Sequence, residues 1–160
     1  MRFTSTPFSK LSLLDLYEIM SLRQEVFVVE QNCPYLDADG KDLYAWHLQG
    51  RDHTGKLIAY ARLLPAGQVC PRGGGDQNYP SIGRVLVASA HRGQGLGKKL
   101  MQEAMGEAQN LFGPQTIEIS AQKYLQRFYT NLGFQATGKE YLEDGIPHLQ
   151  MRWHPDQKRE

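Results

Sequence analysis

The sequence predicts an α+β domain in which helices flank a mixed, mostly antiparallel sheet. Strand-like stretches alternate with stretches of helical period, and an apolar strand at 82–88 passes through a glycine-rich turn into an amphipathic helix around 95–110. That strand, loop and helix unit supplies the one parallel crossover. A chain of 160 residues fits one domain, which we expect to span 1–160 with a core of about 8–154.

The first element is predicted to be a helix. Ser12 and Asp15 form a candidate capping box at the start of a helix over about 12–30, whose apolar residues lie near one face. Residues 31–42 combine Pro, Gly and three Asp, which predicts a turn-forming connection.

A hairpin and a long loop follow. The stretches 44–48 and 57–64 are strand-like and are joined by a polar turn around Asp52 and Gly55. Residues 65–80 contain three Pro and a run of three Gly, so we expect a long loop inside the domain and not a linker.

The second half is more regular. The helix after the glycine turn has an apolar stripe made of Leu96, Leu100, Ala104, Ala108 and Leu111. Residues 116–121 alternate as a half-buried strand does, and a short helix then ends at Gly133. Strands at 134–142 and 146–153 flank Glu143-Asp144-Gly145, a turn signal for an antiparallel hairpin.

Composition excludes several classes of protein. Eighteen Lys and Arg against 17 Asp and Glu give a net charge of +1, so we expect no nucleic-acid partner. No apolar run approaches the ~20 residues of a membrane span, so we expect no membrane partner either. Cys33 and Cys70 lack the spacing of a zinc site, which predicts no metal and a reducing, cytoplasmic setting.

Charged residues in two other segments are expected to have structural roles. Asp37, Asp39 and Asp42 do not fit an EF-hand, because Gly40 comes too early, so we expect a solvated turn or a rim that attracts cations. Arg84 lies in an apolar strand and is predicted to pair with an acid of the fold.

The most informative segment is the turn RGQGLG at 92–97. Its glycines let backbone N–H groups turn toward a ligand, and the following helix N-terminus adds partial positive charge, so the turn suits a pyrophosphate. A P-loop is excluded, since Arg92 occupies its first glycine position and Lys99 its Ser/Thr position. A dinucleotide fingerprint would need Gly at Lys98, which argues against a nucleotide-dependent oxidoreductase.

The pattern (Arg/Gln)xxGx(Gly/Ala) after a strand ending in LxV resembles the acetyl-CoA loop of the GNAT superfamily of N-acetyltransferases. The segment QKYLQRFYTNLGF at 122–134 resembles that superfamily's next conserved helix through Phe128-Tyr129 and Leu132-Gly133-Phe134. Gln122 and Leu125 depart from its usual Asn and Ala. The segments 26–42, 59–65, 82–87 and 141–148 resemble the ElaA-type branch more narrowly.

The resemblance implies a set of site residues. Amides of the glycine loop would hold the pyrophosphate of acetyl-CoA, and the strand before it would pair with the pantetheine arm. The implied cofactor-binding residues are Val85, Leu86, Val87, Arg92, Gly93, Gln94, Gly95, Leu96, Gly97, Lys98 and Gln122. Tyr129 would protonate the departing thiolate; alternatively, it belongs to the apolar face of its helix.

Deprotonating the attacking amine requires a base, since an alkylammonium of pKa ~10.4 loses its proton at a cost of ~4–5 kcal/mol near pH 7. Residues 81–88 hold no carboxylate, so the base that some relatives place there is absent. We take His148 and Glu30 as the candidate bases, because imidazole titrates near neutral pH and Glu30 borders the loop that lines the acceptor cleft in this family. Further candidates are Glu118, Glu140 and Glu143.

The resemblance implies an acetyl-CoA-dependent N-acetyltransferase acting by direct attack in a ternary complex, with a small-molecule or peptide amine as acceptor. The alternative is a non-catalytic acyl-CoA-binding regulatory module. Charge is segregated along the chain: 77–102 carry four basic residues and no acid, whereas 30–42 and 140–144 are acidic. The oligomeric state stays open, a homodimer being one option, and the acceptor is not decoded.

Overall fold

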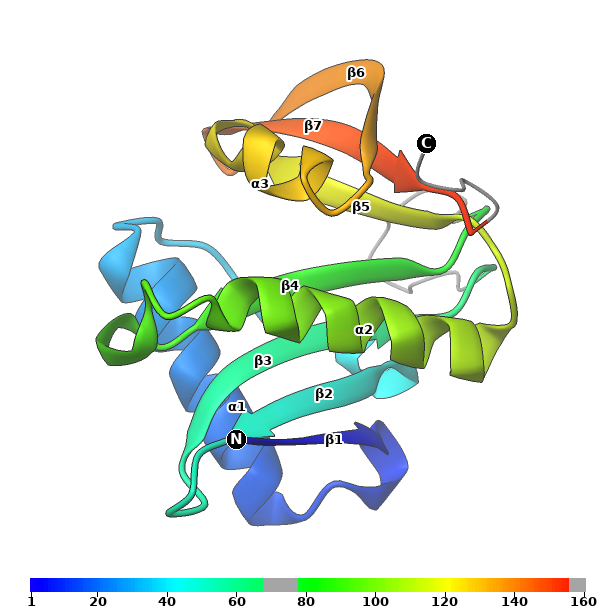
Figure 1. Cartoon of the computed structure of the whole chain (residues 1–160). Helices are drawn as coiled ribbons and strands as arrows, with labels where there is room; N and C mark the ends of the chain where they lie inside the picture. The colour runs from blue at the N-terminus through cyan, green and yellow to red at the C-terminus, as the bar shows by residue number, and fades with distance from the viewer. Residues whose placement is uncertain (68–77, 156–160) are drawn as a thin grey trace.

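The structure is a computed structural model that describes residues 1–67 and 78–155 (Figure 1). Seven strands form one sheet in the order β1-β2-β3-β4-β5-β7-β6, and only β4 and β5 run parallel. The strands are β1 (Arg2–Pro7), β2 (Trp46–Arg51), β3 (Leu57–Leu64), β4 (Ser81–Val87), β5 (Ile117–Gln122), β6 (Gln135–Glu143) and β7 (Ile146–Trp153). The predicted α+β class with one crossover is therefore confirmed.

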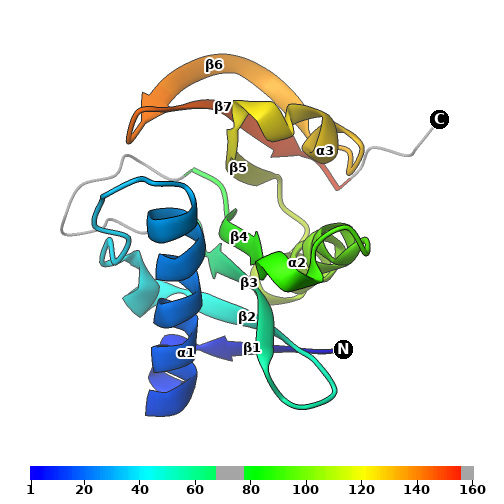
Figure 2. The same ribbon diagram turned by 90° about the vertical axis from the view of Figure 1, so that its left-hand side faces the viewer.

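Helices cover both faces of the sheet. The helices are α1 (Leu13–Arg23), α2 (Leu96–Phe112) and α3 (Gln126–Thr130). Figure 2 shows α1 on one face, and α2 and α3 on the other. No helix in the described part of the chain is long and apolar enough to cross a membrane.

The first helix begins as predicted. The Ser12 hydroxyl accepts from the Asp15 amide and the Asp15 carboxylate accepts from the Ser12 amide, which confirms the capping box. The helix continues past α1 as a π-helical segment over Gln24–Glu30, so the predicted extent of 12–30 is right. Strand β1 was not predicted, because Phe3 is the one large apolar residue in a polar stretch.

Both predicted hairpins are present. The first pairs β2 with β3, although β2 begins two residues later than the expected stretch. The second turns at Asp144 (φ 49°) and Gly145 (φ 78°), consecutive left-handed residues of the kind a tight hairpin turn uses. Much of the predicted loop at 65–80 lies outside the described residues.

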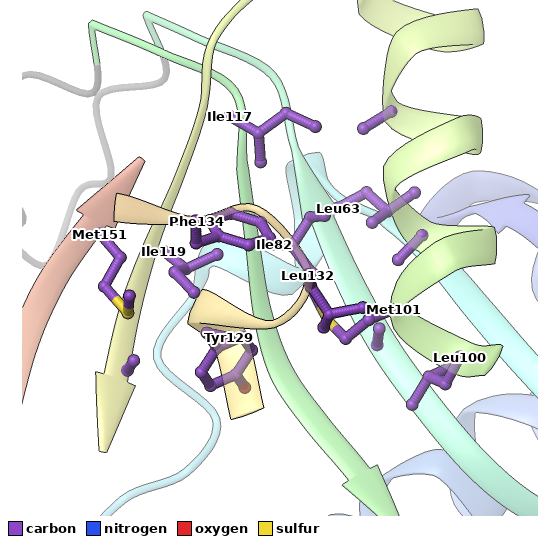
Figure 3. Close-up of a cluster of buried hydrophobic side chains, with 14 of the residues drawn as sticks. Leu63, Ile82, Leu100, Met101, Ile117, Ile119, Tyr129, Leu132, Phe134 and Met151 are labelled. Atoms are coloured by element: carbon purple, nitrogen blue, oxygen red, sulfur yellow. The ribbon is translucent and has the colours of Figure 1, made fainter. Parts of the chain in front are cut away.

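The main core lies between the sheet and the pair α2 and α3 (Figure 3). The predicted stripe of α2 is confirmed, since Leu100, Ala104 and Ala108 are buried there. Ile117 and Ile119 of β5 point into the same core, and the alternation predicted for that strand is also confirmed. A second, smaller cluster packs α1 against the opposite face.

Strand β4 carries a β-bulge, and apolar residues before and after it pack in different cores. Tyr60 pairs with Leu86 and Arg62 with Gly83, so β4 has one residue more than β3 across this stretch. Arg84, inside the stretch, has a left-handed backbone with φ 52°. As a result Ile82 packs in the core beside α2, whereas Leu86 packs in the cluster beside α1.

The acidic turn was predicted wrongly. Instead of a solvated turn or cation-attracting rim, Asp37 and Asp42 are buried and bind arginines from three other elements. Those contacts are Arg23 Nε to Asp37 (2.7 Å), Arg23 Nη1 to Asp42 (2.6 Å), Arg62 Nη1 to Asp39 (2.7 Å) and to Asp42 (3.0 Å), and Arg84 Nε to Asp37 (2.7 Å). The carboxylates are thus already neutralised, and the prediction that Arg84 pairs with an acid is confirmed.

Candidate active site

A cleft of about 650 Å³ opens where β4 and β5 diverge. Among the described residues, Ser81 and Glu118 are the one registered pair between these strands. The rest of the wall comes mainly from the π-helical segment, residues 31–41, the end of β3, residues 124–129 and the β6–β7 hairpin. Eight of the predicted site residues line the cleft: Glu30, Val85, Leu86, Val87, Arg92, Gln122, Tyr129 and His148.

The glycine loop, residues 92–97, starts at the edge of the cleft: of its residues, Arg92 lines the cleft and the others follow directly after it. Gly93 (φ 78°) and Gly95 (φ 73°) are left-handed, a backbone shape that side chains disfavour. No described side chain caps the N-terminus of α2, and a Cβ on either glycine would meet no described atom within 4 Å. The first-turn amides of α2 are therefore open to an anion, which the helix dipole also favours.

Arg92 and Glu30 form an ion pair at the cleft. Arg92 Nη1 donates to Glu30 Oε1 and Nη2 donates to Oε2 at 3.1 Å, while Nε donates to the Val87 carbonyl at 2.9 Å. The hydrogen bond from Arg92 lowers the pKa of Glu30. Glu30 is thereby held as a carboxylate and is a weaker proton acceptor than an unpaired one.

Tyr129 belongs both to the core and to the cleft. Its side chain packs edge-on against Phe128 (5.0 Å between centroids) and Phe134 (6.0 Å), and only 7% of the residue is exposed. Burial raises the pKa of Tyr129 to about 12. The phenol keeps its proton throughout the physiological range.

Three polar residues lie side by side on the wall of the cleft that β5, β7 and β6 form. Gln122 of β5 is in register with His148 of β7, which is in register with Tyr141 of β6. The His148 Nδ1 atom is 2.7 Å from the Ile146 carbonyl, and a carbonyl only accepts, so Nδ1 carries the proton. In the neutral ring Nε2 then carries the lone pair; it lies 3.6 Å from Glu143 Oε2.

Other wall residues are engaged with one another. The Gln122 amide exchanges hydrogen bonds with Gln31 at 3.2 and 3.5 Å, and Ser120 bonds to Tyr141 and Glu143. Sequence reasoning missed Gln31, Ser120 and Tyr141. The alternation of β5 could have indicated Ser120, which falls on the face away from the core.

Two further candidate bases are paired with cations. Glu118 accepts from Arg152 Nε at 3.0 Å, and Glu140 pairs with Lys123 at 2.7 Å. His148 and Glu143 are therefore the candidate bases without a Lys or Arg partner among the described residues. Glu143 accepts from the Ser120 hydroxyl at 3.2 Å, whereas no described donor bonds to His148 Nε2.

Comparisons with known proteins show the family to which the chain is similar. A model of the acetyltransferase (GNAT) domain family matches residues 51–155. The chain is 40% identical to the protein ElaA of Escherichia coli K12 over 145 residues, which are 89% of this chain and 90% of ElaA. It is also 42% identical to a UPF0039 protein of Schizosaccharomyces pombe over 95% of this chain and 96% of that protein.

Solved structures give the same picture. An acyl-CoA N-acyltransferase from Pseudomonas aeruginosa superposes with a TM-score of 0.83 at 41% identity, covering 96% of this chain and 99% of that one. The crystal structure of Escherichia coli ElaA superposes with a TM-score of 0.84 at 36% identity, covering 96% of this chain and all of the other.

Proposed function

Because this chain belongs to the GNAT acetyltransferase family, in its ElaA-type branch, we propose that it transfers an acetyl group from acetyl-CoA to a primary amine. The observation that carries the proposal is one cleft that joins a protonated tyrosine, a histidine with a free nitrogen and an edge of β4 that has one registered partner on β5 among the described residues, and that reaches Arg92 at the start of the glycine loop. The acceptor would be a small molecule or a peptide amine that attacks directly in a ternary complex.

The strand and loop of the cleft provide the binding surface. Residues 82–87 of β4 have no registered partner on β5 among the described residues. Backbone groups of Val85 to Val87 would therefore pair with an added extended segment such as pantetheine, apart from the Val87 carbonyl, which accepts from Arg92 Nε. The amides of Gly93 to Lys98 would hold the pyrophosphate.

Tyr129 would act as the general acid. A pKa of about 12 keeps its proton available to the sulfur of departing CoA. Packing against Phe128 and Phe134 restricts the ring, so that the hydroxyl needs little reorganisation at the moment of transfer.

His148 would act as the general base through Nε2. The Ile146 carbonyl fixes the tautomer, and the Glu143 carboxylate at 3.6 Å would stabilise the imidazolium that forms. Glu30 is less suited, since its ion pair with Arg92 lowers the pKa of its carboxyl.

Two measurements test the function. Isothermal calorimetry should detect binding of acetyl-CoA but not of NAD or ATP. A thiol-release assay against a panel of diamines, amino acids and peptides should then detect transfer to at least one acceptor. Binding without transfer to any amine would favour a non-catalytic acyl-CoA-binding module instead.

Gly95→Glu is expected to weaken acetyl-CoA binding at least 10-fold. The substitution forces a side chain onto a left-handed residue (φ 73°) and adds a negative charge at the N-terminus of α2. Calorimetry with acetyl-CoA measures it. Gly106→Glu makes the same chemical change in the exposed middle of α2 and should leave the affinity unchanged; equal affinities for both variants would contradict a pyrophosphate site at the loop.

His148→Gln is expected to lower kcat/KM by ~10²-fold, the usual scale for a lost general base, with acetyl-CoA affinity unchanged. Thiol release and calorimetry measure the two quantities. Glu140→Gln is the matched control, because Glu140 lies in an exposed ion pair with Lys123, and it should retain wild-type kcat/KM. Wild-type turnover in His148→Gln would exclude the histidine as base.

A further inference from the structure

Arg84 has an unusual backbone for its residue type. It is one of three described non-glycine residues with positive φ, and the other two, Asn32 and Asp144, are of types that tolerate this region. A long side chain there costs free energy, so something in the surroundings must hold it.

The side chain of Arg84 is held by residues 35–39. Its Nε donates to Asp37 Oδ1 at 2.7 Å, its Nη2 donates to the Asp37 carbonyl at 3.2 Å, and its guanidinium lies 5.8 Å from the centroid of the Tyr35 ring. Asp37 itself is 4% exposed and is fixed independently by Arg23 and by the Tyr35 hydroxyl at 2.8 Å. Arg84 is thus tied to a rigid anchor.

The strained residue lies directly before the strand segment proposed to hold acetyl-CoA. The bulge at Arg84 changes which face of the sheet the following residues take, since Ile82 and Leu86 pack in different cores. If residue 84 took an ordinary extended φ, the bulge would be lost and the pairing of β4 with β3 would shift by one residue. Val85–Val87 would then be rotated relative to the cleft.

We propose that Asp37, acting through Arg84, holds the β4 bulge in the conformation that presents Val85–Val87 to acetyl-CoA. Both are positioning residues in this role, and the inference rests on the proposed function.

Two substitutions at position 84, to alanine and to glycine, distinguish a role in holding the β4 bulge from a role in stabilising the fold alone. Arg84→Ala loses the ion pair but keeps a Cβ at a left-handed position, so the bulge relaxes. Arg84→Gly loses the same ion pair yet accepts the left-handed backbone at no steric cost. We expect acetyl-CoA to bind at least 10-fold more weakly to R84A and within ~3-fold of wild type to R84G, by isothermal calorimetry. Arg84→Asn should resemble R84G.

Two further variants complete the test. Asp37→Asn should weaken acetyl-CoA binding like R84A, but in the R84G background it should cause no further loss. Arg152→Ala removes an ion pair with Glu118 from the opposite wall; neither of these two residues has a positive φ, and the variant should leave the affinity unchanged. The melting temperature is expected to fall for both R84A and R84G, since both variants lose the ion pair with Asp37.

Equal acetyl-CoA affinities for R84A and R84G, whether both weakened or both unchanged, would overturn the inference. That result is distinct from failure of the proposed function, which would appear as wild-type protein that binds no acetyl-CoA.

Discussion

Tyr129→Phe is expected to lower kcat by about 10²-fold or more at saturating acetyl-CoA, with the affinity for acetyl-CoA unchanged within ~2-fold. The loss falls on kcat because the hydroxyl would act only when the thiolate leaves. Phenylalanine keeps the edge-on contacts with Phe128 and Phe134, so the fold should be preserved.

The elevated pKa of Tyr129 makes a second readout available. Since burial raises this pKa to about 12, the phenol stays protonated well above pH 9. A general acid is lost from catalysis only as pH rises through its pKa, so wild-type kcat should show no alkaline decline due to Tyr129 below about pH 10.

The matched control is Tyr124→Phe. Tyr124 also lines the cleft, but it is 74% exposed, and its hydroxyl should not reach the reacting sulfur. Stopped-flow or thiol-release assays should find wild-type kcat in this variant. Wild-type kcat in Tyr129→Phe, or equal losses in the two variants, would exclude Tyr129 as the acid.

Local patterns predicted those parts of the fold in which neighbours in sequence determine the structure. The stripe of α2, the alternation of β5 and the Asp144-Gly145 turn each depend on residues within a few positions, and all three are confirmed. Strand β1 was not predicted, because it is stabilised by pairing with β2, a contact distant in sequence, and its own polar sequence gives no strand pattern.

The candidate site divides in the same way. The glycine loop is a local signal: a turn was predicted at 92–97, and Gly93 and Gly95 there have the left-handed backbone that glycine favours. The acidic turn was misjudged because the partners of Asp37 lie 14 and 47 residues away, at Arg23 and Arg84. The pairing of Arg92 with Glu30 spans 62 residues, and neither side chain carries a local sign of it.

Arg23→Met is expected to reduce the free energy of unfolding by about 3–5 kcal/mol, the usual cost of removing one partner from a buried ion pair. Arg23 is wholly buried and donates to Asp37 Oδ2 at 2.7 Å, to the Asp37 carbonyl at 3.0 Å and to Asp42 Oδ1 at 2.6 Å. Methionine fills similar space but leaves both carboxylates short of a donor.

The same substitution should change how stability depends on pH. Burial by itself raises the pKa of Asp42, but Arg23 and Arg62 outweigh it and lower the pKa below the unfolded value. A lowered carboxyl pKa contributes stability that is present above the unfolded pKa, near 4, and is lost as pH falls through the folded pKa. Without Arg23 that contribution shrinks. The difference in stability between Arg23→Met and wild type should therefore stay nearly constant from pH 7 to about pH 5 and become smaller as pH falls below about 4.

Urea denaturation at pH 7 and at pH 3 measures both effects. Arg51→Met is the matched control, because Arg51 pairs with Asp15 and Glu18 on the surface, where its side chain is 24% exposed. Exposed pairs contribute about 1 kcal/mol or less, so this variant should lose far less stability than Arg23→Met, and the loss should change little with pH. Equal losses in the two variants would mean that the buried arginine and aspartate network stabilises the fold no more than a surface ion pair does.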